Sequence, residues 1–254
     1  KDNEFKVCAD PNNMPYSNSN SEGFENKIAE VLADDLGREL SFQFWPDRFG
    51  FIRNTIKANR CDVIIGTNTT YDALNTTKPY YRAGHVWIYR KDSGYKIDNW
   101  DSPDLRKGVI GIVDKSPVAQ ALNANNLMAN AKPYRLMRDL TKSPGQLVDH
   151  VVSGEIDVAI MWGPIGGYYA KQSKEDLVVV LIPEYSEGNE KLTGKTYWNI
   201  SAGVRKKDDE RRDMIEAALI RNKDKIRKIM DDFGVPYTDP VFGDRLDGYK
   251  RHKN

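Results

Sequence analysis

Two segments far apart in the chain carry the same pattern of helix, polar turn and short buried strand. The first ends in Cys61-Asp62-Val63-Ile64-Ile65-Gly66 and the second in Ile156-Asp157-Val158-Ala159-Ile160-Met161. Short apolar runs of this kind, rich in β-branched residues and bounded by turns, are typical of strands buried on both faces of a parallel sheet. The match is too short to establish a duplication, but it predicts two lobes of similar build.

Strands and helices alternate along the rest of the chain. The apolar residues of 24–36 fall on one helical face, and Gly37 follows them where a helix commonly ends. This alternation predicts an α/β fold with doubly wound, mainly parallel sheets. The predicted strands are residues 5–9, 39–45, 62–66, 85–90, 108–113, 134–137, 157–162, 177–182 and 197–204. Further helices are expected around 51–58, after 116 and 143, and from about 206 to 233.

Composition excludes several classes of function. The formal net charge of +1 gives no overall field that would attract nucleic acid or an anionic membrane. No uninterrupted apolar run approaches the roughly 18 residues of a membrane span. We therefore expect neither a nucleic-acid partner nor a spanning helix.

The sequence gives little indication of catalytic activity. The chain has no Gly-x-Ser-x-Gly, no Cys-x-x-Cys and only three scattered histidines, so we expect no catalytic residue, no metal and no cofactor. Adjacent aspartates at 34–35, 208–209 and 231–232 lie in helical stretches, where neighbouring side chains diverge. The loop predicted at 163–167 is rich in glycine but lacks the Lys-Ser/Thr of a phosphate-binding loop. The prediction is a protein that is not an enzyme.

Three stretches carry a resemblance to a known family: 23–29, then 61–66 followed by 67–71, and 77–81. They resemble the periplasmic substrate-binding proteins of solute transport systems, of the two-lobed kind related to amino-acid binders. The resemblance implies a type II periplasmic binding protein fold whose lobes are joined by two crossing strands. It places residues 1–89 and 200–254 in one lobe and 90–199 in the other. It also implies a periplasmic protein in its mature form, with the signal peptide removed. The chain begins at Lys1 rather than at a methionine, as expected for such a mature form.

A narrower resemblance rests on residues 7–17, 50–55 and 162–169. These look like the binding-protein-like accessory proteins of quinoprotein dehydrogenases, the MxaJ and XoxJ type. The resemblance implies a non-enzymatic helper of a pyrroloquinoline-quinone-dependent methanol dehydrogenase, acting in its activation or maturation. The alternative is the solute-binding component of an ABC transporter with an aromatic or uncharged ligand.

The charged anchors of amino-acid binders are missing. Those proteins place an arginine a few residues after a Gly-x-Thr segment, but that place falls near Ala73 here and the next arginine is Arg82. They also place an aspartate at the end of a second-lobe strand, where this chain has Trp162. Burying an α-amino acid without these partners would cost several kcal/mol or more. We therefore expect no binding of free α-amino acids.

The ligand crevice of such a fold lies beyond the carboxyl ends of the strands. The loop 10–16 leaves the first strand there, although it could also be an ordinary connection. The residues expected to line the crevice are mostly aromatic, which suits a flat or apolar ligand or a segment of a protein partner, but some of them could simply fill the lobe cores. They are Asp10, Asn12, Tyr16, Trp45, Phe49, Thr67, Tyr71, Trp162, Tyr168 and Tyr169.

The chain has two cysteines, Cys8 and Cys61. If the protein is exported to an oxidising compartment, a disulfide between them is favoured, whereas two buried thiols would be compatible with any compartment. Geometry opposes the bridge, because a parallel register would separate the two by about three residues, or roughly 10 Å of strand rise against a limit near 7 Å. A bulge or a late start of the second strand would be needed. On balance, we expect Cys8 and Cys61 to form a disulfide.

Overall fold

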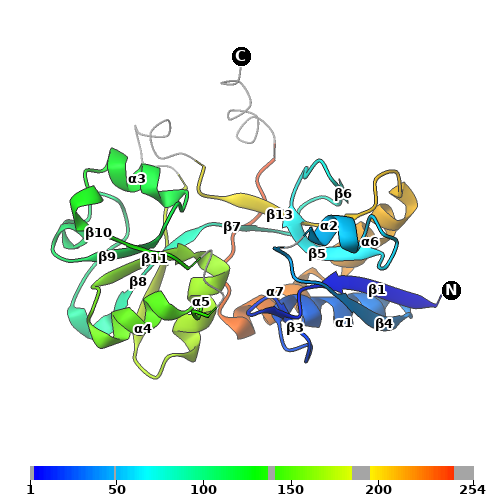
Figure 1. Cartoon of the computed structure of the whole chain (residues 1–254), viewed down its shortest axis with the longest axis horizontal. Coiled ribbons are helices and arrows are strands. Elements are labelled where there is room, and N and C mark those ends of the chain that lie inside the picture. Colours follow the sequence, from blue (N-terminus) through cyan, green and yellow to red (C-terminus); the bar gives the residue numbers. More distant parts are fainter. Residues whose placement is uncertain (1–2, 49, 137–140, 185–194, 243–254) are drawn as a thin grey trace, which may run out of the picture. The chain divides into compact units, whose positions relative to one another are not determined.

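The computed structural model describes residues 3–48, 50–136, 141–184 and 195–242. They form two compact units, each an α/β layer structure (Figure 1). Unit 1 comprises Lys1–Arg82, Trp198–Asp232 and Thr238–Asn254, and unit 2 comprises Ala83–Tyr197 and Phe233–Tyr237. The chain thus enters unit 2 earlier than the predicted lobe limit at residue 89. A short C-terminal segment, expected in the first lobe, also belongs to unit 2.

The unit 1 sheet has the order β4-β1-β5-β13-β6, with β7 also paired to β13. Its first three strands are parallel, and β13 runs antiparallel to β5. The strand bounds are β1 Glu4–Ala9, β4 Glu39–Phe44, β5 Val63–Asn68, β6 Asn75–Thr76, β7 Tyr81–Ala83 and β13 Trp198–Val204. A small hairpin of β2 (Asn12–Asn13) and β3 (Ser17–Asn18) follows β1. The carboxyl ends of β1, β4 and β5 therefore meet at one edge of the sheet.

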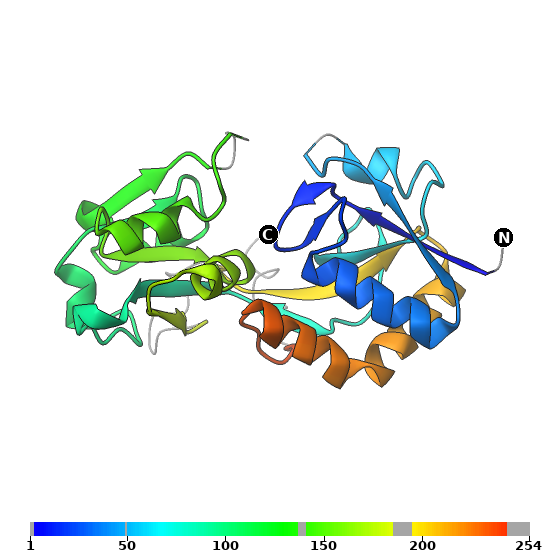
Figure 2. The ribbon, with the colours of Figure 1, turned by 90° about the horizontal axis from the view of Figure 1, so that it is seen from below.

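Helices cover both faces of this sheet (Figure 2). The long helix α1 (Phe24–Leu36) packs beside α6 (Asp209–Arg221) on one face, and the short α2 (Phe51–Asn54) lies on the other. The predicted end of α1 is confirmed, because Gly37 adopts the left-handed conformation with φ of 61°. The single helix expected from 206 to 233 is instead two, α6 and α7 (Lys223–Phe233). Between them, the Asn222 side chain donates a hydrogen bond to the carbonyl of Ala218 at 2.9 Å, which favours a break there.

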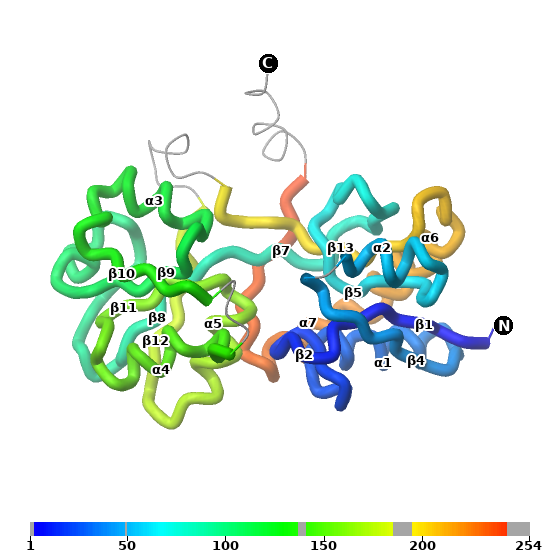
Figure 3. The backbone as a smooth tube through the Cα atoms, viewed as in Figure 1, coloured from blue at the N-terminus to red at the C-terminus, as the bar shows by residue number. Residues whose placement is uncertain are grey.

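The unit 2 sheet has the order β10-β9-β11-β8-β12 (Figure 3). Strands β10, β9 and β11 are parallel, whereas β8 runs antiparallel to both of its neighbours. The bounds are β8 His85–Arg90, β9 Ile110–Val113, β10 Ala131–Tyr134, β11 Val158–Trp162 and β12 Leu177–Leu181. The strand predicted at 134–137 is wrong in position, since β10 ends at Tyr134. Pro133 hides this strand in the sequence, because proline usually argues against a strand. It is tolerated here because β10 is an edge strand that pairs on one side only.

Two apolar layers sandwich the unit 2 sheet. Helices α4 (Gln146–Ser153) and α5 (Gly163–Gln172) pack on one face, and α3 (Val118–Ala124) lies on the other (Figure 1). Short 3-10 turns at Lys91–Ser93, Pro103–Arg106 and Met128–Asn130 complete the second layer. Its centre is the pair Trp87 and Trp100, whose rings meet edge to face at 5.1 Å. Within the described ranges, no helix is long and apolar enough to cross a membrane.

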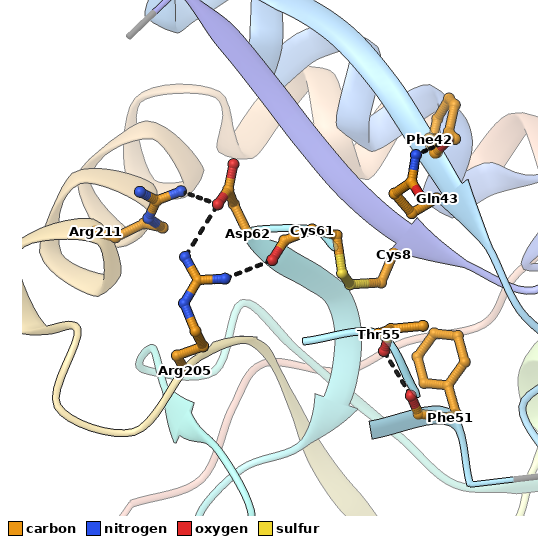
Figure 4. Close-up of a disulfide and its surroundings, with 9 residues drawn as sticks. All are labelled: Cys8, Phe42, Gln43, Phe51, Thr55, Cys61, Asp62, Arg205 and Arg211. Carbon is orange, nitrogen blue, oxygen red and sulfur yellow. Dashed lines mark hydrogen bonds and ion pairs between the residues drawn. A yellow bond between two sulfur atoms is a disulfide. The ribbon is translucent and has the colours of Figure 1, made fainter. Parts of the chain in front are cut away.

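Cys8 and Cys61 are joined by a disulfide with their Cα atoms 5.5 Å apart (Figure 4). The register pairs Cys8 with Ile64, which is the offset that argued against a bridge. The bridge is possible because β5 begins only at Val63, so Cys61 precedes the paired strand and is free to turn toward Cys8. Arg205 donates to the Cys61 carbonyl at 2.6 Å, and its guanidinium lies 3.0 Å from the Asp62 carboxylate. These contacts hold the segment before β5 in place.

Candidate functional site

Asp10 organises the loops that leave the carboxyl ends of β1 and β4. One carboxylate oxygen accepts the Asn12 N–H and the other accepts the Asp47 N–H, each at 2.8 Å. Hydrogen bonds to an ionised acceptor are the strong kind. Asp10 therefore ties two loops of unit 1 together, and Asn12 is exposed on the hairpin beside it.

The start of α1 packs tightly against the loop after β1. The Tyr16 ring lies 5.2 Å from that of Phe24, and the Tyr16 carbonyl accepts the Glu25 N–H at 3.0 Å. A Cβ on Gly23 would overlap the Tyr16 backbone, so only glycine allows this approach. Tyr16 and the first turn of α1 are thereby held together.

Glu25, in this first turn, is mostly buried and lies directly against Gly66 of β5. A Cβ at Gly66 would overlap the Glu25 carboxylate. Burial, and secondarily the negative charge of Asp47, raises the pKa of Glu25 from 4.5 to about 8. In the described part of the chain, no hydrogen-bond or ion-pair partner faces its carboxyl group.

Two tyrosines complete this arrangement. The Tyr80 hydroxyl donates to the carbonyl of Ile65, next to Gly66, at 3.0 Å. The Tyr80 and Tyr81 rings meet edge to face at 5.0 Å. Burial raises the pKa of both tyrosines well above 10, and the charge of Glu25 raises it further. Tyr16, Glu25, Gly66, Tyr80 and Tyr81 are hereafter called the Glu25 cluster.

The other predicted residues of unit 1 are scattered. Trp45 packs against the core around the disulfide, with the Arg60 guanidinium 5.6 Å from its ring centre. Thr67 lies in β5 opposite Ser201, and Tyr71 is exposed. Phe49 lies outside the described residues. Of the predicted set in this unit, Tyr16 belongs to the Glu25 cluster, and Asp10 binds the Asp47 N–H on the loop after β4.

Trp162 ends β11 and precedes the first turn of α5 in unit 2. Its partly buried ring meets the His85 ring edge to face at 5.3 Å. Burial lowers the pKa of His85 to about 4, so the imidazole is neutral at pH 7 and its Nδ1 donates to the Thr196 carbonyl at 3.0 Å. Trp162, predicted to stand where amino-acid binders carry an aspartate, thus packs against a neutral imidazole.

The loop predicted at 163–167 is instead the start of helix α5. Pro164 stands in the first turn, where its missing N–H costs nothing. Added Cβ atoms at Gly166 and Gly167 would crowd Met161 and Gly234 respectively, so these glycines permit close packing of the helix. Gly166 also approaches Ile88, and both Ile88 and Gly234 are distant in the chain, so the sequence alone indicates a loop here.

Tyr168 and Tyr169 consequently lie within α5 rather than beside a loop. Tyr168 stacks on Phe233 with ring centres 6.1 Å apart, and Tyr169 packs over Gly145. Both are partly buried in contacts within unit 2. Both tyrosines therefore make packing contacts, and their place in a ligand crevice stays a prediction.

Arg82, the first arginine after the predicted anchor position near Ala73, makes contacts inside unit 1. Arg82 is 3% exposed, and its guanidinium donates to the Asn199 side chain at 3.0 Å. Among the described residues, no group of three His, Cys, Asp or Glu side chains could hold a metal ion. Near the strand ends, burial raises the pKa of Glu25 to about 8 and also raises that of Asp47. The sequence shows Glu25 only as a polar residue in a helix start, since its burial depends on Gly66.

Comparison with known proteins places the chain in a family. The model of the bacterial extracellular solute-binding proteins, family 3, matches residues 5–235. The chain belongs to this family. Its fold is accordingly the type II periplasmic binding protein fold, as predicted, with mixed α/β units and mostly parallel sheets.

Three of the similar proteins have names of the MoxJ, MxaJ or XoxJ type. MoxJ of Paracoccus denitrificans is 30% identical over 243 residues, which cover 91% of this chain and 88% of that protein. MxaJ from Methlophaga aminisulfidivorans is 32% identical in sequence to this chain. Its crystal structure matches with a TM-score of 0.78, and the match covers 92% of this chain and 100% of that one. The periplasmic binding protein XoxJ from Methylobacterium extorquens is 31% identical with a TM-score of 0.75, covering 93% and 100%. The predicted resemblance to the MxaJ and XoxJ type is confirmed.

Proposed function

We propose that this protein is a periplasmic accessory protein that engages a pyrroloquinoline-quinone-dependent methanol dehydrogenase. It aids activation or maturation of that enzyme and catalyses no reaction itself. The observation that carries the proposal is the similarity to MoxJ, MxaJ and XoxJ over more than nine-tenths of the chain. The sequence stretches that resemble accessory proteins of quinoprotein dehydrogenases lie in both units.

The residues at the strand ends differ from those that amino-acid binders use to hold their ligand. Ala73 stands near the arginine position of amino-acid binders, and Trp162 with neutral His85 stands at the aspartate position. Arg82 is engaged with Asn199 inside unit 1. An α-amino acid would therefore find neither of its usual charge partners.

Replacing Trp162 by Ala is expected to weaken association with the dehydrogenase at least about tenfold, because aromatic side chains dominate protein interfaces. The thermal midpoint should move by only a few degrees, since the ring is partly exposed. Surface plasmon resonance against the apo-dehydrogenase measures the first quantity and circular dichroism the second. Met128→Ala, which alters an exposed apolar side chain elsewhere in unit 2, is the control. An unchanged affinity would place the contact surface elsewhere, and a large fall in midpoint would make Trp162 a core residue.

The second candidate is a solute-binding component of an ABC transporter, which membership of the solute-binding family favours. Calorimetric titration with a panel of free α-amino acids tests whether the protein binds the usual ligands of its transport relatives. We expect no heat of binding from any of them, because the charged anchors are absent. Micromolar binding of one amino acid would overturn that expectation and support the transport role.

A further inference from the structure

The strands at the ends of the two main sheets differ in how their outer edges are protected. An edge strand presents unpaired backbone groups, and natural proteins protect such edges with charged residues, proline or very short strands. β6 has two residues, β10 carries Lys132 and Pro133, and β4 begins with the exposed Glu39. β12 is the exception, because its sequence Leu-Val-Val-Val-Leu contains no charge, no polar side chain and no proline.

β12 is also accessible at its centre. Among the described residues it pairs on one side only, with β8. Val178 and Val180 pack on the apolar layer at one face of the sheet. Leu177 and Leu181 pack on the layer at the other face, and Val179 between them is 37% exposed. Both faces of the strand are thus packed, and its outer edge has no paired strand in the described structure.

The pairing with β8 shows which backbone groups of β12 point to this outer edge. The Ile182 N–H donates to the His85 carbonyl at 2.9 Å, so this even-numbered position bonds to the β8 side. In an antiparallel pair, alternate residues of a strand bond to the same neighbour. The N–H and C=O groups that point outward therefore belong to Leu177, Val179 and Leu181.

We propose that β12 pairs with β12 of a second copy of this chain, antiparallel, about a two-fold axis at Val179. The strand reads the same in both directions, so this register places Val179 opposite Val179 and Leu177 opposite Leu181. These are the residues whose backbone groups point outward, so both copies satisfy those groups together. A two-fold contact of this kind uses the same surface on both copies, and it therefore closes at a dimer.

Charges beside the strand favour a second copy as the occupant of the edge. Continued outward, the same register places Lys174 opposite Glu184 on both sides of the axis. Opposite charges that face each other across paired strands are stabilising. Within the described part of its own chain, Lys174 forms no ion pair. Asp176, next to the strand, lies 3.3 Å from Lys91 of the same chain, so its charge is compensated within each copy.

The pairing joins the five-stranded sheets of unit 2 from two copies into one continuous sheet. The contact is small, because one short strand from each copy forms its centre, and small interfaces give weak, concentration-dependent association. None of the residues predicted to line the ligand crevice lies in β12. The proposal therefore does not depend on the proposed dehydrogenase partner.

Sedimentation velocity over a concentration series of the full chain tests the proposal. We expect the wild type to change from monomer to dimer as the concentration rises. Val179→Lys sets two like charges opposite each other at the axis and should weaken dimerisation at least about tenfold. Val109→Lys makes the same change at another exposed valine of unit 2, outside β12, and should leave dimerisation unchanged.

Circular dichroism establishes that both lysine variants are folded. A wild type that stays monomeric at every concentration overturns the proposal, and so does a dimer that Val179→Lys does not weaken. If the wild type stays monomeric and Val179→Lys weakens its binding to the dehydrogenase in surface plasmon resonance, the edge belongs to that partner and not to a second copy.

An added cysteine tests the register. Cys8 and Cys61 are joined to each other, so an added thiol has no free native thiol to pair with. Opposite residues that share their hydrogen bonds have Cα atoms about 5.5 Å apart, within reach of a disulfide. Val179→Cys should therefore form a covalent dimer on mild oxidation.

Leu181→Cys is the matched control, because Leu181 of the second copy lies four residues further along the paired strand, or about 13 Å away. We expect no covalent dimer from this variant in non-reducing electrophoresis. Cross-linking of Leu181→Cys that equals or exceeds that of Val179→Cys would refute the two-fold pairing at Val179.

Discussion

Replacing Glu25 by Gln is expected to remove a fall in stability that the wild-type protein shows as the pH rises toward 8. The folded-state pKa of Glu25 is raised from 4.5 to about 8, so the native protein holds a proton that the unfolded chain has already lost. Stability therefore decreases with pH across this window, by up to about 1.4 kcal/mol per pH unit. Over the whole window the expected loss is on the order of a few kcal/mol.

His85 acts in the opposite sense at the acidic end. Its folded-state pKa is lowered from 6.5 to about 4, so protonation of the unfolded chain reduces stability as the pH falls below 6.5. The contribution of Glu25 is therefore clearest as the pH rises from 6.5 toward 8, because the contribution of His85 fades as the unfolded chain loses its proton. Urea denaturation of the wild type, Glu25→Gln and the control Asp34→Asn over this range measures it. Parallel pH profiles for wild type and Glu25→Gln would show that Glu25 titrates normally.

Removing the disulfide with the double substitution Cys8→Ala and Cys61→Ala is expected to lower the free energy of unfolding by about 4 kcal/mol. The bridge joins residues 53 apart in sequence. In the chain-entropy model, closing a loop of that length in the unfolded state contributes on the order of 4 kcal/mol. Alanine avoids burying a hydroxyl among Phe51, Ile56 and the other apolar neighbours of the two sulfur atoms.

Denaturation of the oxidised wild type, the reduced wild type and the double variant measures this effect. The reduced protein should lose most of the same stability, because it also lacks the bridge but keeps both sulfur atoms. A double variant as stable as the oxidised protein would contradict the expected contribution. Mass spectrometry of alkylated, unreduced protein is the direct check, since two labelled thiols would show that no bridge forms.

Much of the fold was predictable because local patterns report which side of a segment is buried. The apolar face of 24–36 and the left-handed Gly37 define α1, and the β-branched run before Gly66 defines β5. Three short stretches also carried the family resemblance that the match over residues 5–235 confirms. In each case the signal lies within one segment, so no distant contact was needed to detect it.

Other features depended on residues that are distant in sequence. The glycines of α5 indicate a loop in the sequence, whereas in the structure Ile88 and Gly234 occupy the space of their missing side chains. The Cys8–Cys61 bridge depended on where β5 begins, which the register with β1 decides. Periodicity cannot report such contacts, because it records only the neighbours of a residue along its own helix or strand.

Glu25 is the clearest case. In sequence it is one polar residue in the first turn of an amphipathic helix, where a solvated carboxylate is the ordinary expectation. Its raised pKa arises because Gly66 lacks a side chain and lets the carboxyl group enter the space beside β5. The sequence by itself determined the helix and the glycine. Only the tertiary structure brought the two together, because desolvation depends on every atom around a group, whichever part of the chain supplies it.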